Sequence, residues 1–269
     1  MRLAQELYEG VTLKGKGSVG LITYLRTDST RISEEADASC REYIAQQYGE
    51  QFVGDKTAVK SSKTGKIQDA HEAIRPTDSS LSPAMLKEQL PRDLFRLYQL
   101  IWTRFLASRM AEAVYETTSV KIGAGDYRFN VAASKVKFDG FMTVYSYDSE
   151  KSTMNAAMKK ITKDTEITLS GLDPQQHFTQ PPAHFTEASL VKTLEELGIG
   201  RPSTYAPTIT TLLARRYIVK ESKNLYITEL GEAVNDMMED GFPTIVDVNF
   251  TANMESLLDG VEEGKVKWK

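Results

Sequence analysis

Tyr24 and Arg26 form the residue pair in this sequence that is best suited to chemistry on a phosphate. They follow an apolar run, residues 19–22, and precede a cluster of small polar residues. If the run is a strand, both side chains project to the same face, because side chains alternate with a period of two. The phenol can then attack a phosphodiester while the guanidinium binds its oxygens. Spacing alone also allows an ordinary half-buried packing tyrosine.

Three sequence blocks resemble segments of the bacterial type IA DNA topoisomerases. Residues 20–29, Gly-Leu-Ile-Thr-Tyr-Leu-Arg-Thr-Asp-Ser, resemble the active-site segment of that family, and residues 70–77, Ala-His-Glu-Ala-Ile-Arg-Pro-Thr, resemble its second active-site segment. Residues 180–188 and 198–207, the latter Gly-Ile-Gly-Arg-Pro-Ser-Thr-Tyr-Ala-Pro, resemble its DNA-strand-binding helices. The blocks occur in the family's order, and the resemblance extends from Gln5 to the C-terminus. Leu25 departs from the methionine expected there.

The resemblance implies roles for individual residues. It makes Tyr24 the nucleophile, Arg26 the group that stabilises the phosphate, and His71 a third catalytic residue. It implies DNA contacts from six residues: Arg201, Ser203, Thr204, Arg215, Arg75 and Gln5. Asp28 and Glu9 are expected to support the site without contacting DNA. From the residues alone, His71 could equally be a surface histidine at the end of a loop, and Asp28 could cap a turn.

The activity implied by the resemblance is ATP-independent breakage, passage and rejoining of single-stranded DNA. A 5′-phosphotyrosine intermediate at Tyr24 would conserve the phosphodiester energy, and negatively supercoiled duplex DNA would be relaxed. The family binds Mg²⁺ through a carboxylate cluster in an N-terminal domain. The sequence has no D-x-D-x-x-G pattern, so we expect no metal site in it. We therefore expect a fragment that is inactive alone, from a parent that is a monomer.

Residue patterning predicts an α+β, multidomain chain. We expect a mainly helical domain with the tyrosine over residues 1–114, an antiparallel β arch segment over residues 115–180, and a winged-helix-like helical domain over residues 181–269. Helical spacing predicts helices over residues 2–9, 33–48 (with Ser33 as N-cap) and 92–113 in the first of these domains.

The two later domains are predicted to differ in their elements. Short strands are expected over residues 117–122, 127–133, 140–147 and 166–169. After them we expect a helix between Thr186 and Gly198, a second helix over residues 203–215, a hairpin that turns at Lys223-Asn224, and two closing helices. Arg201, Ser203 and Thr204 would then place donors at the positive end of the second helix, which suits a phosphate.

Composition excludes several classes of protein. The net charge of −4 and the pI of about 5.6 argue against a chain that coats nucleic acid by bulk charge. Residues 225–264 contain acidic residues and no Lys or Arg, which predicts a solvated helical face. A single cysteine, Cys40, excludes an intrachain disulfide and is expected to pack in the core. There is no apolar run of membrane length, so we expect a cytoplasmic, nucleoid-associated protein.

Two other functions remain open on the sequence pattern. A helix–turn–helix–hairpin order could belong to a winged-helix DNA-binding protein without chemistry. A tyrosine recombinase is disfavoured, because that class surrounds its tyrosine with several arginines and histidines. Residues 15–20 match G-x-G-x-x-G, but nucleotide binding needs a strand before the loop and a helix after it. The expected order here is the reverse, which favours a flexible connection.

Overall fold

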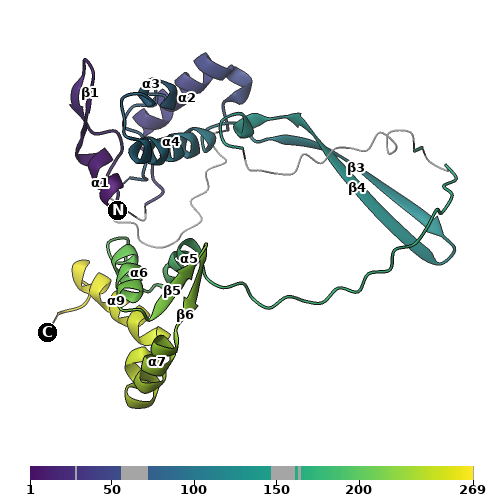
Figure 1. Ribbon diagram of the computed structural model, residues 1–269. Helices are drawn as coiled ribbons and strands as arrows, with labels where there is room; N and C mark the ends of the chain where they lie inside the picture. Colours follow the sequence, from purple (N-terminus) through teal and green to yellow (C-terminus); the bar gives the residue numbers. More distant parts are fainter. Residues whose placement is uncertain (28, 56–71, 147–160, 163–164, 269) are drawn as a thin grey trace. The chain divides into compact units, whose positions relative to one another are not determined.

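The computed structural model describes residues 1–27, 29–55, 72–146, 161–162 and 165–268 (Figure 1). The chain divides into two compact units, Met1–Asp173 and Pro174–Lys269. Helices alternate with antiparallel hairpins of two strands each, which confirms the predicted α+β class. The three-part division into domains stays a prediction. No helix in the described part of the chain is long and apolar enough to cross a membrane.

The first unit is built on a small helical core. Its helices are α1 (Arg2–Glu9), α2 (Glu34–Tyr48), α3 (Pro83–Leu86) and α4 (Arg92–Ala107), with the 3-10 turn η1 (Glu50–Phe52). A short hairpin, β1 (Val11–Leu13) and β2 (Gly17–Val19), follows α1. The apolar face of α4 supplies the centre of the core, against which α1, α2 and the segment after β2 pack: Leu94, Tyr98, Trp102, Phe105, Leu106, Leu7, Leu21, Ile22, Cys40 and Ile44.

The start of α2 confirms its predicted cap, because the Ser33 hydroxyl accepts a hydrogen bond from the Ala36 amide. The predicted end of the long helix at Ala113 is wrong. Helix α4 ends at Ala107 because the following backbone pairs with the strand-like segment after η1. Gly54 N donates to Arg109 O at 2.9 Å, and Ala111 N donates to Phe52 O at 2.8 Å.

A partly buried ion network ties α2 to the end of α4. Asp37 Oδ2 accepts from Arg41 Nε at 2.6 Å, and Asp37 Oδ1 accepts from Arg109 Nη1 at 3.1 Å. Arg41 also donates to the carbonyl of Gly54. Burial alone would raise the pKa of Asp37, but the hydrogen bonds from the two arginines outweigh it and hold that pKa below its ordinary value. The network therefore stabilises the charged carboxylate.

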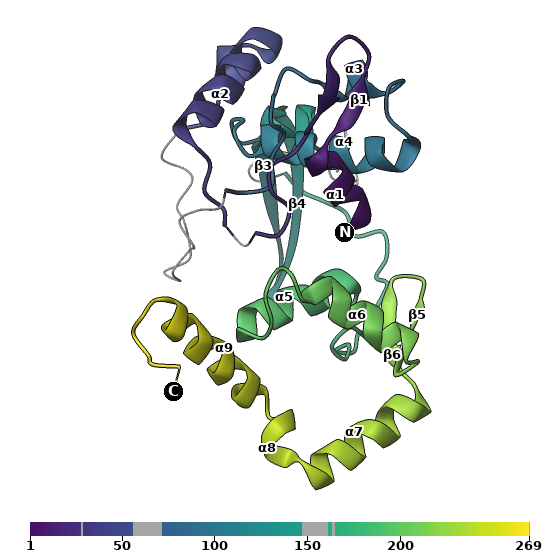
Figure 2. The same cartoon turned by 90° about the vertical axis from the view of Figure 1, so that its left-hand side faces the viewer.

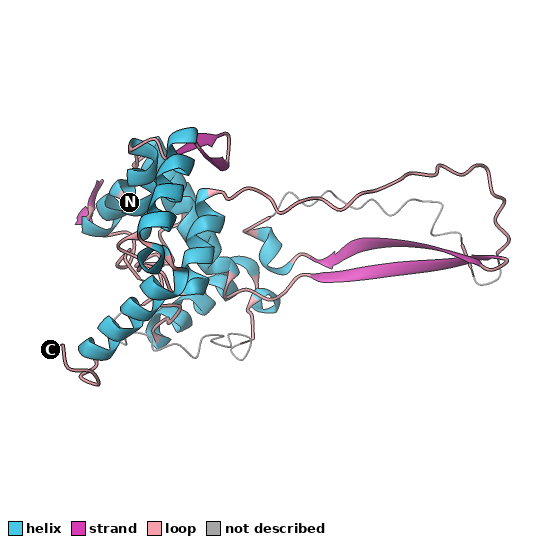
Figure 3. Cartoon of the chain, turned by 90° about the horizontal axis from the view of Figure 1, so that it is seen from below, coloured by secondary structure: helices cyan, strands magenta, loops and turns pink. Residues whose placement is uncertain are grey.

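A long two-stranded ribbon follows α4 (Figure 3). Its strands, β3 (Val114–Ala124) and β4 (Tyr127–Phe138), include both predicted short strands and extend beyond them. The predicted strand over 140–147 is wrong: η3 (Gly140–Thr143) is a 3-10 turn in which Phe141 N donates to Ala111 O. Residues 166–169 form no strand either. The Phe138 ring packs on Phe52 with centroids 4.8 Å apart, which anchors the ribbon's base.

The second unit begins with the predicted helix–turn–helix–hairpin order (Figure 2). Its elements are α5 (Glu187–Leu197), α6 (Tyr205–Ala214), β5 (Ile218–Glu221), β6 (Asn224–Ile227), α7 (Glu229–Gly241), α8 (Pro243–Val246) and α9 (Val248–Glu262). Thr186 caps α5, and Gly198 ends it with a φ of 73°, as predicted.

Three details of this unit differ from the predictions. Helix α6 begins at Tyr205 rather than Ser203, because residues 202–204 form a turn. The hairpin turns at Ser222-Lys223, where Ser222 has a φ of 55°, so Asn224 already belongs to β6. Three helices close the chain instead of two, because Pro243 starts the short α8 between α7 and α9.

Gly231 provides a test of packing in this unit. A Cβ at Gly231, in the first turn of α7, would lie 2.0 Å from the carbonyl oxygen of Tyr217. We expect Gly231→Ala to lower the free energy of unfolding by about 1–3 kcal/mol through overpacking. The matched control is Gly241→Ala in the same helix, where a Cβ meets nothing within 4 Å. Urea unfolding followed by circular dichroism would contradict the prediction if the two variants were equally stable.

Candidate active site

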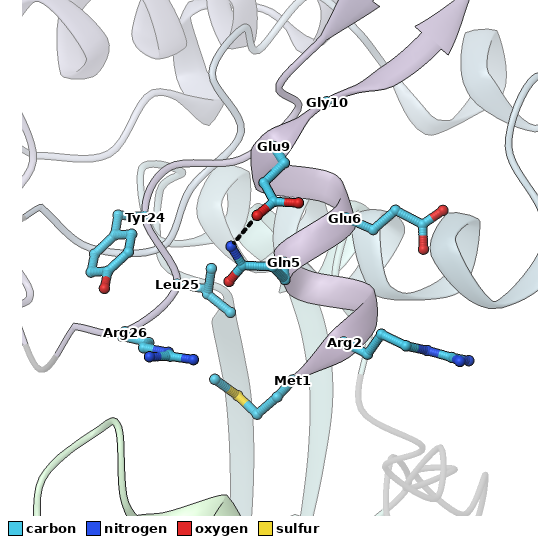
Figure 4. A pocket seen from close by; sticks show the side chains of 9 residues that line it. All are labelled: Met1, Arg2, Gln5, Glu6, Glu9, Gly10, Tyr24, Leu25 and Arg26. Atoms are coloured by element: carbon cyan, nitrogen blue, oxygen red, sulfur yellow. Dashed lines mark hydrogen bonds between the residues drawn. The ribbon is translucent and has the colours of Figure 1, made fainter.

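A pocket of about 490 Å³ lies between α1 and the segment that carries Tyr24 (Figure 4). Helix α1 contributes residues spaced by three or four, which share one helical face. The segment after β2 contributes three consecutive residues. The lining consists of Met1, Arg2, Gln5, Glu6, Glu9, Gly10, Tyr24, Leu25 and Arg26. The pocket therefore combines a phenol with two guanidinium groups and two carboxyl groups.

The prediction that Tyr24 lies on a strand is wrong. Among the described residues, the segment forms one isolated bridge, between Ile22 and Pro76. Beyond it, Thr23 N donates to Arg75 O at 3.0 Å, and the Thr23 hydroxyl donates to Ala73 O at 2.8 Å. The neighbour is thus a loop instead of a strand, and the chain bends after Ile22. This geometry still brings Tyr24 and Arg26 to the same pocket, while the intervening Leu25 is buried.

The residues around the phenol are held by specific contacts. The ring of Tyr24 packs edge-on against Tyr8 of α1, with centroids 5.5 Å apart and an interplanar angle of 69°. On the same helix, Gln5 Nε2 donates to Glu9 Oε1 at 2.6 Å. Figure 4 shows this bonded pair beside Tyr24. Gln5 and Glu9 therefore lie on one face of α1 and line the pocket with Tyr24, while their implied roles stay predictions.

The second active-site segment is described only in part. His71 and Asp28 both lie outside the described residues. Arg75 donates to Glu72 Oε2 from Nη2 at 2.7 Å and from Nε at 3.0 Å. Burial would raise the pKa of Glu72, but its bonds with Arg75 hold that pKa below the ordinary value. A DNA phosphate at Arg75 would have to compete with this carboxylate.

Four of the six predicted DNA-contact residues lie in the second unit, and the structure groups three of them. Arg201, Ser203 and Thr204 occupy the turn before α6, where the Thr204 hydroxyl accepts from Arg201 N at 2.9 Å and donates to Arg201 O at 3.0 Å. Ser203 and Thr204 are exposed. Arg215 is at the other end of this ten-residue helix, as its C-cap, and is exposed too. One helix therefore separates the two groups.

Two charged pocket residues, Arg2 and Glu6, were not predicted from the sequence. Both lie on the same face of α1 as Gln5 and Glu9, at spacings of three and four residues. The helical spacing of residues 2–9 predicts that Arg2 and Glu6 share this face, once α1 is known to line the pocket. Cys40, by contrast, is fully buried as expected, and burial raises the pKa of its thiol to about 11.

A tyrosine and an arginine beside one pocket, in a helical unit that carries a long ribbon, are features expected of a strand-cleaving DNA enzyme. A family model described as DNA topoisomerase matches residues 1–269. The chain belongs to the bacterial type IA DNA topoisomerases. It is similar to the solved structure of full-length topoisomerase I from Thermotoga maritima, with 38% sequence identity and a TM-score of 0.78. The match covers 99% of this chain and 43% of the Thermotoga chain, so the chain spans less than half of that relative's length.

Proposed function

We propose that this chain carries the nucleophile of a topoisomerase that breaks, passes and rejoins single-stranded DNA. The observation that carries the proposal is that Tyr24 and Arg26 line one pocket with Gln5 and Glu9 in a member of this family. The parent acts on single-stranded regions of negatively supercoiled duplex DNA, as a monomer in the cytoplasm, associated with the nucleoid.

The proposed step is an exchange of phosphate esters. The Tyr24 phenol oxygen attacks a backbone phosphorus and forms a 5′-phosphotyrosine bond. The bond between phosphorus and the 3′ oxygen breaks, and that oxygen takes a proton to become a hydroxyl. Since a free tyrosine has a pKa of roughly 10, its proton must be removed during the attack. Arg26 stabilises the charge on the phosphate oxygens, and His71 assists the transfer. Reversal by the 3′-hydroxyl needs no ATP.

Mg²⁺ is assigned to the parent enzyme instead of to this chain. The described residues contain no group of three or more His, Cys, Asp or Glu side chains that could hold a metal ion. In the proposal, the N-terminal domain of the parent holds Mg²⁺, and the isolated chain does not relax DNA.

A winged-helix protein without chemistry is the second candidate, because the second unit has that order of elements. In such a protein the second helix reads base edges in the major groove, chiefly through Arg, Lys, Asn or Gln. Helix α6 has the sequence YAPTITTLLA and contains none of these residues. We therefore favour contacts to the backbone of a single strand from the ends of α6.

Trapping of a covalent adduct tests the proposal. The chain is mixed with the N-terminal Mg²⁺-binding domain of the family, Mg²⁺ and a single-stranded oligonucleotide labelled at its 3′ end, and the reaction is quenched in denaturant. We expect a labelled protein band that depends on Tyr24. If the two polypeptides assemble and stay folded but give no adduct, the catalytic assignment is wrong. Preference for a particular duplex sequence would then support the winged-helix candidate.

The contribution of Arg26 has a defined expected size. Arg26 is exposed at the pocket, so its loss should leave the fold intact. We expect Arg26→Ala to slow adduct formation about 10²- to 10³-fold, the range seen when one donor to a developing oxyanion is removed. Arg26→Lys keeps the positive charge but loses the forked pair of donors, so its rate of adduct formation should lie between those of wild type and Arg26→Ala. Single-turnover rates equal to wild type for both variants would contradict this role.

A further inference from the structure

Arg201 is held by two carboxylates of α9. Its Nη2 donates to Asp259 Oδ2 at 2.7 Å, and its Nη1 is 3.6 Å from Glu255 Oε2. Nη1 also donates to the carbonyl of Gly200 at 2.8 Å. The hydrogen bond to Asp259, followed by the charges of both carboxylates, raises the pKa of Arg201. The best cationic candidate for a phosphate contact in this unit is therefore already engaged within the unit.

The two carboxylates change the charge that an approaching phosphate meets. A guanidinium of charge +1 and two carboxylates of charge −1 each leave the cluster with a net charge of −1. Carboxylate and phosphate use the same forked donors of an arginine, so both cannot occupy the same donors together. A DNA phosphate that takes the Nη2 donor of Arg201 therefore displaces Asp259 from it, and the net negative charge of the cluster repels the phosphate as it approaches.

The surroundings of the cluster indicate that this exchange can occur. Asp259 is 55% exposed and the Arg201 side chain is 34% exposed, and ion pairs with such access to water are weak. Helix α9 has no Lys or Arg of its own to engage its carboxylates. The neighbouring hydroxyls of Ser203 and Thr204 are exposed beside Arg201 and could contact the incoming phosphate.

We propose that Glu255 and Asp259 of α9 compete with DNA for the Arg201 guanidinium. Glu255 and Asp259 occupy the Arg201 guanidinium, and binding of a strand exchanges these carboxylates for a backbone phosphate. The inference rests on the proposed function, because it takes Arg201 as a phosphate contact. It assigns α9 a regulatory role: the carboxylates of α9 weaken strand binding in this unit by holding Arg201.

The test compares two double variants of the 269-residue chain. Glu255→Gln with Asp259→Asn removes the competing charges and keeps the shape of both side chains. The matched control, Glu232→Gln with Asp236→Asn, makes the same charge change at the same spacing on α7, where both residues are exposed. Affinity for a fluorescein-labelled oligothymidine is measured by anisotropy at two salt concentrations, with circular dichroism as a check of folding.

We expect the α9 variant to bind about threefold to tenfold more tightly than wild type, the scale of a weak exposed ion pair together with relief of repulsion. The α7 control should change affinity less than twofold. Adding Arg201→Ala to the α9 variant should remove the gain. A gain that is absent, equal to the control, or retained without Arg201 would overturn the proposal. If the Tyr24 adduct forms but the gain is absent, only this inference fails, whereas a missing adduct refutes the proposed function itself.

Discussion

Replacement of Tyr24 by phenylalanine is expected to reduce the covalent DNA adduct to background. The substitution removes only the phenol oxygen, which forms the bond to phosphorus, and no other pocket group can replace it in a phosphotyrosine. The aromatic ring is retained, and with it the packing on Tyr8, whose ring centroid is 5.5 Å away. The free energy of unfolding should therefore change by no more than about 1.5 kcal/mol, the net contribution of a typical hydrogen bond. Denaturing gels of the reaction with the labelled oligonucleotide measure the adduct.

Tyr8→Phe is the matched control for this experiment. Tyr8 is a partly exposed tyrosine whose ring contacts Tyr24. It supplies a second phenol, on a ring whose centroid is 5.5 Å from that of Tyr24, so the control distinguishes chemistry at Tyr24 from a general effect of losing a hydroxyl. Adduct at the wild-type level with Tyr24→Phe would refute the assignment. So would an equal loss of adduct with Tyr8→Phe.

Asp37→Ala is expected to produce the largest loss of stability, about 3–5 kcal/mol in the free energy of unfolding of the first unit. The substitution leaves the Arg41 and Arg109 side chains, which are only 10% and 9% exposed, without their shared carboxylate. Glu42→Ala, at an exposed position of the same helix, should cost less than about 0.5 kcal/mol. Urea unfolding compares them, and similar values for both would show that the network contributes little.

The same network predicts how stability depends on pH. The folded pKa of Asp37 is below its ordinary value of 3.8 because Arg41 and Arg109 donate hydrogen bonds to the carboxylate. The charged carboxylate therefore contributes stability above that value, and the contribution is lost as pH falls through the folded pKa. The stability difference between wild type and Asp37→Asn should be full at pH 7 and should shrink below pH 3.8. Unfolding free energies across this range measure it, and a constant difference would contradict the prediction.

Local patterns in the sequence predicted much of the secondary structure. The cap at Ser33, the capped and glycine-terminated helix from Thr186 to Gly198, and the burial of Cys40 all follow from short-range rules and are confirmed. These features depend on neighbouring residues, because a capping hydroxyl bonds an amide three positions later and a glycine tolerates a positive φ. Membership of the family was likewise visible in three blocks of sequence.

Tertiary contacts decided the features that local rules missed. Tyr24 was expected on a strand, but the segment pairs with a loop at Ile22–Pro76 and bends. Helix α4 ends six residues early because its following backbone bonds to residues 52–54, which are far away in sequence. The engagement of Arg201 by Asp259, across 58 residues, could not be read from a stretch that looked like a solvated acidic face.

The sequence by itself therefore determined which groups are available for chemistry, the phenol of Tyr24 and the guanidinium of Arg26, and which helices begin and end nearby. Only the tertiary structure decided that those groups face Gln5 and Glu9 of α1, and that the carboxylates of α9 engage Arg201. The physical reason is the separation along the chain over which each kind of interaction acts. Caps, turns and periodicity act within a few residues, whereas a pocket or an ion pair depends on how distant elements pack.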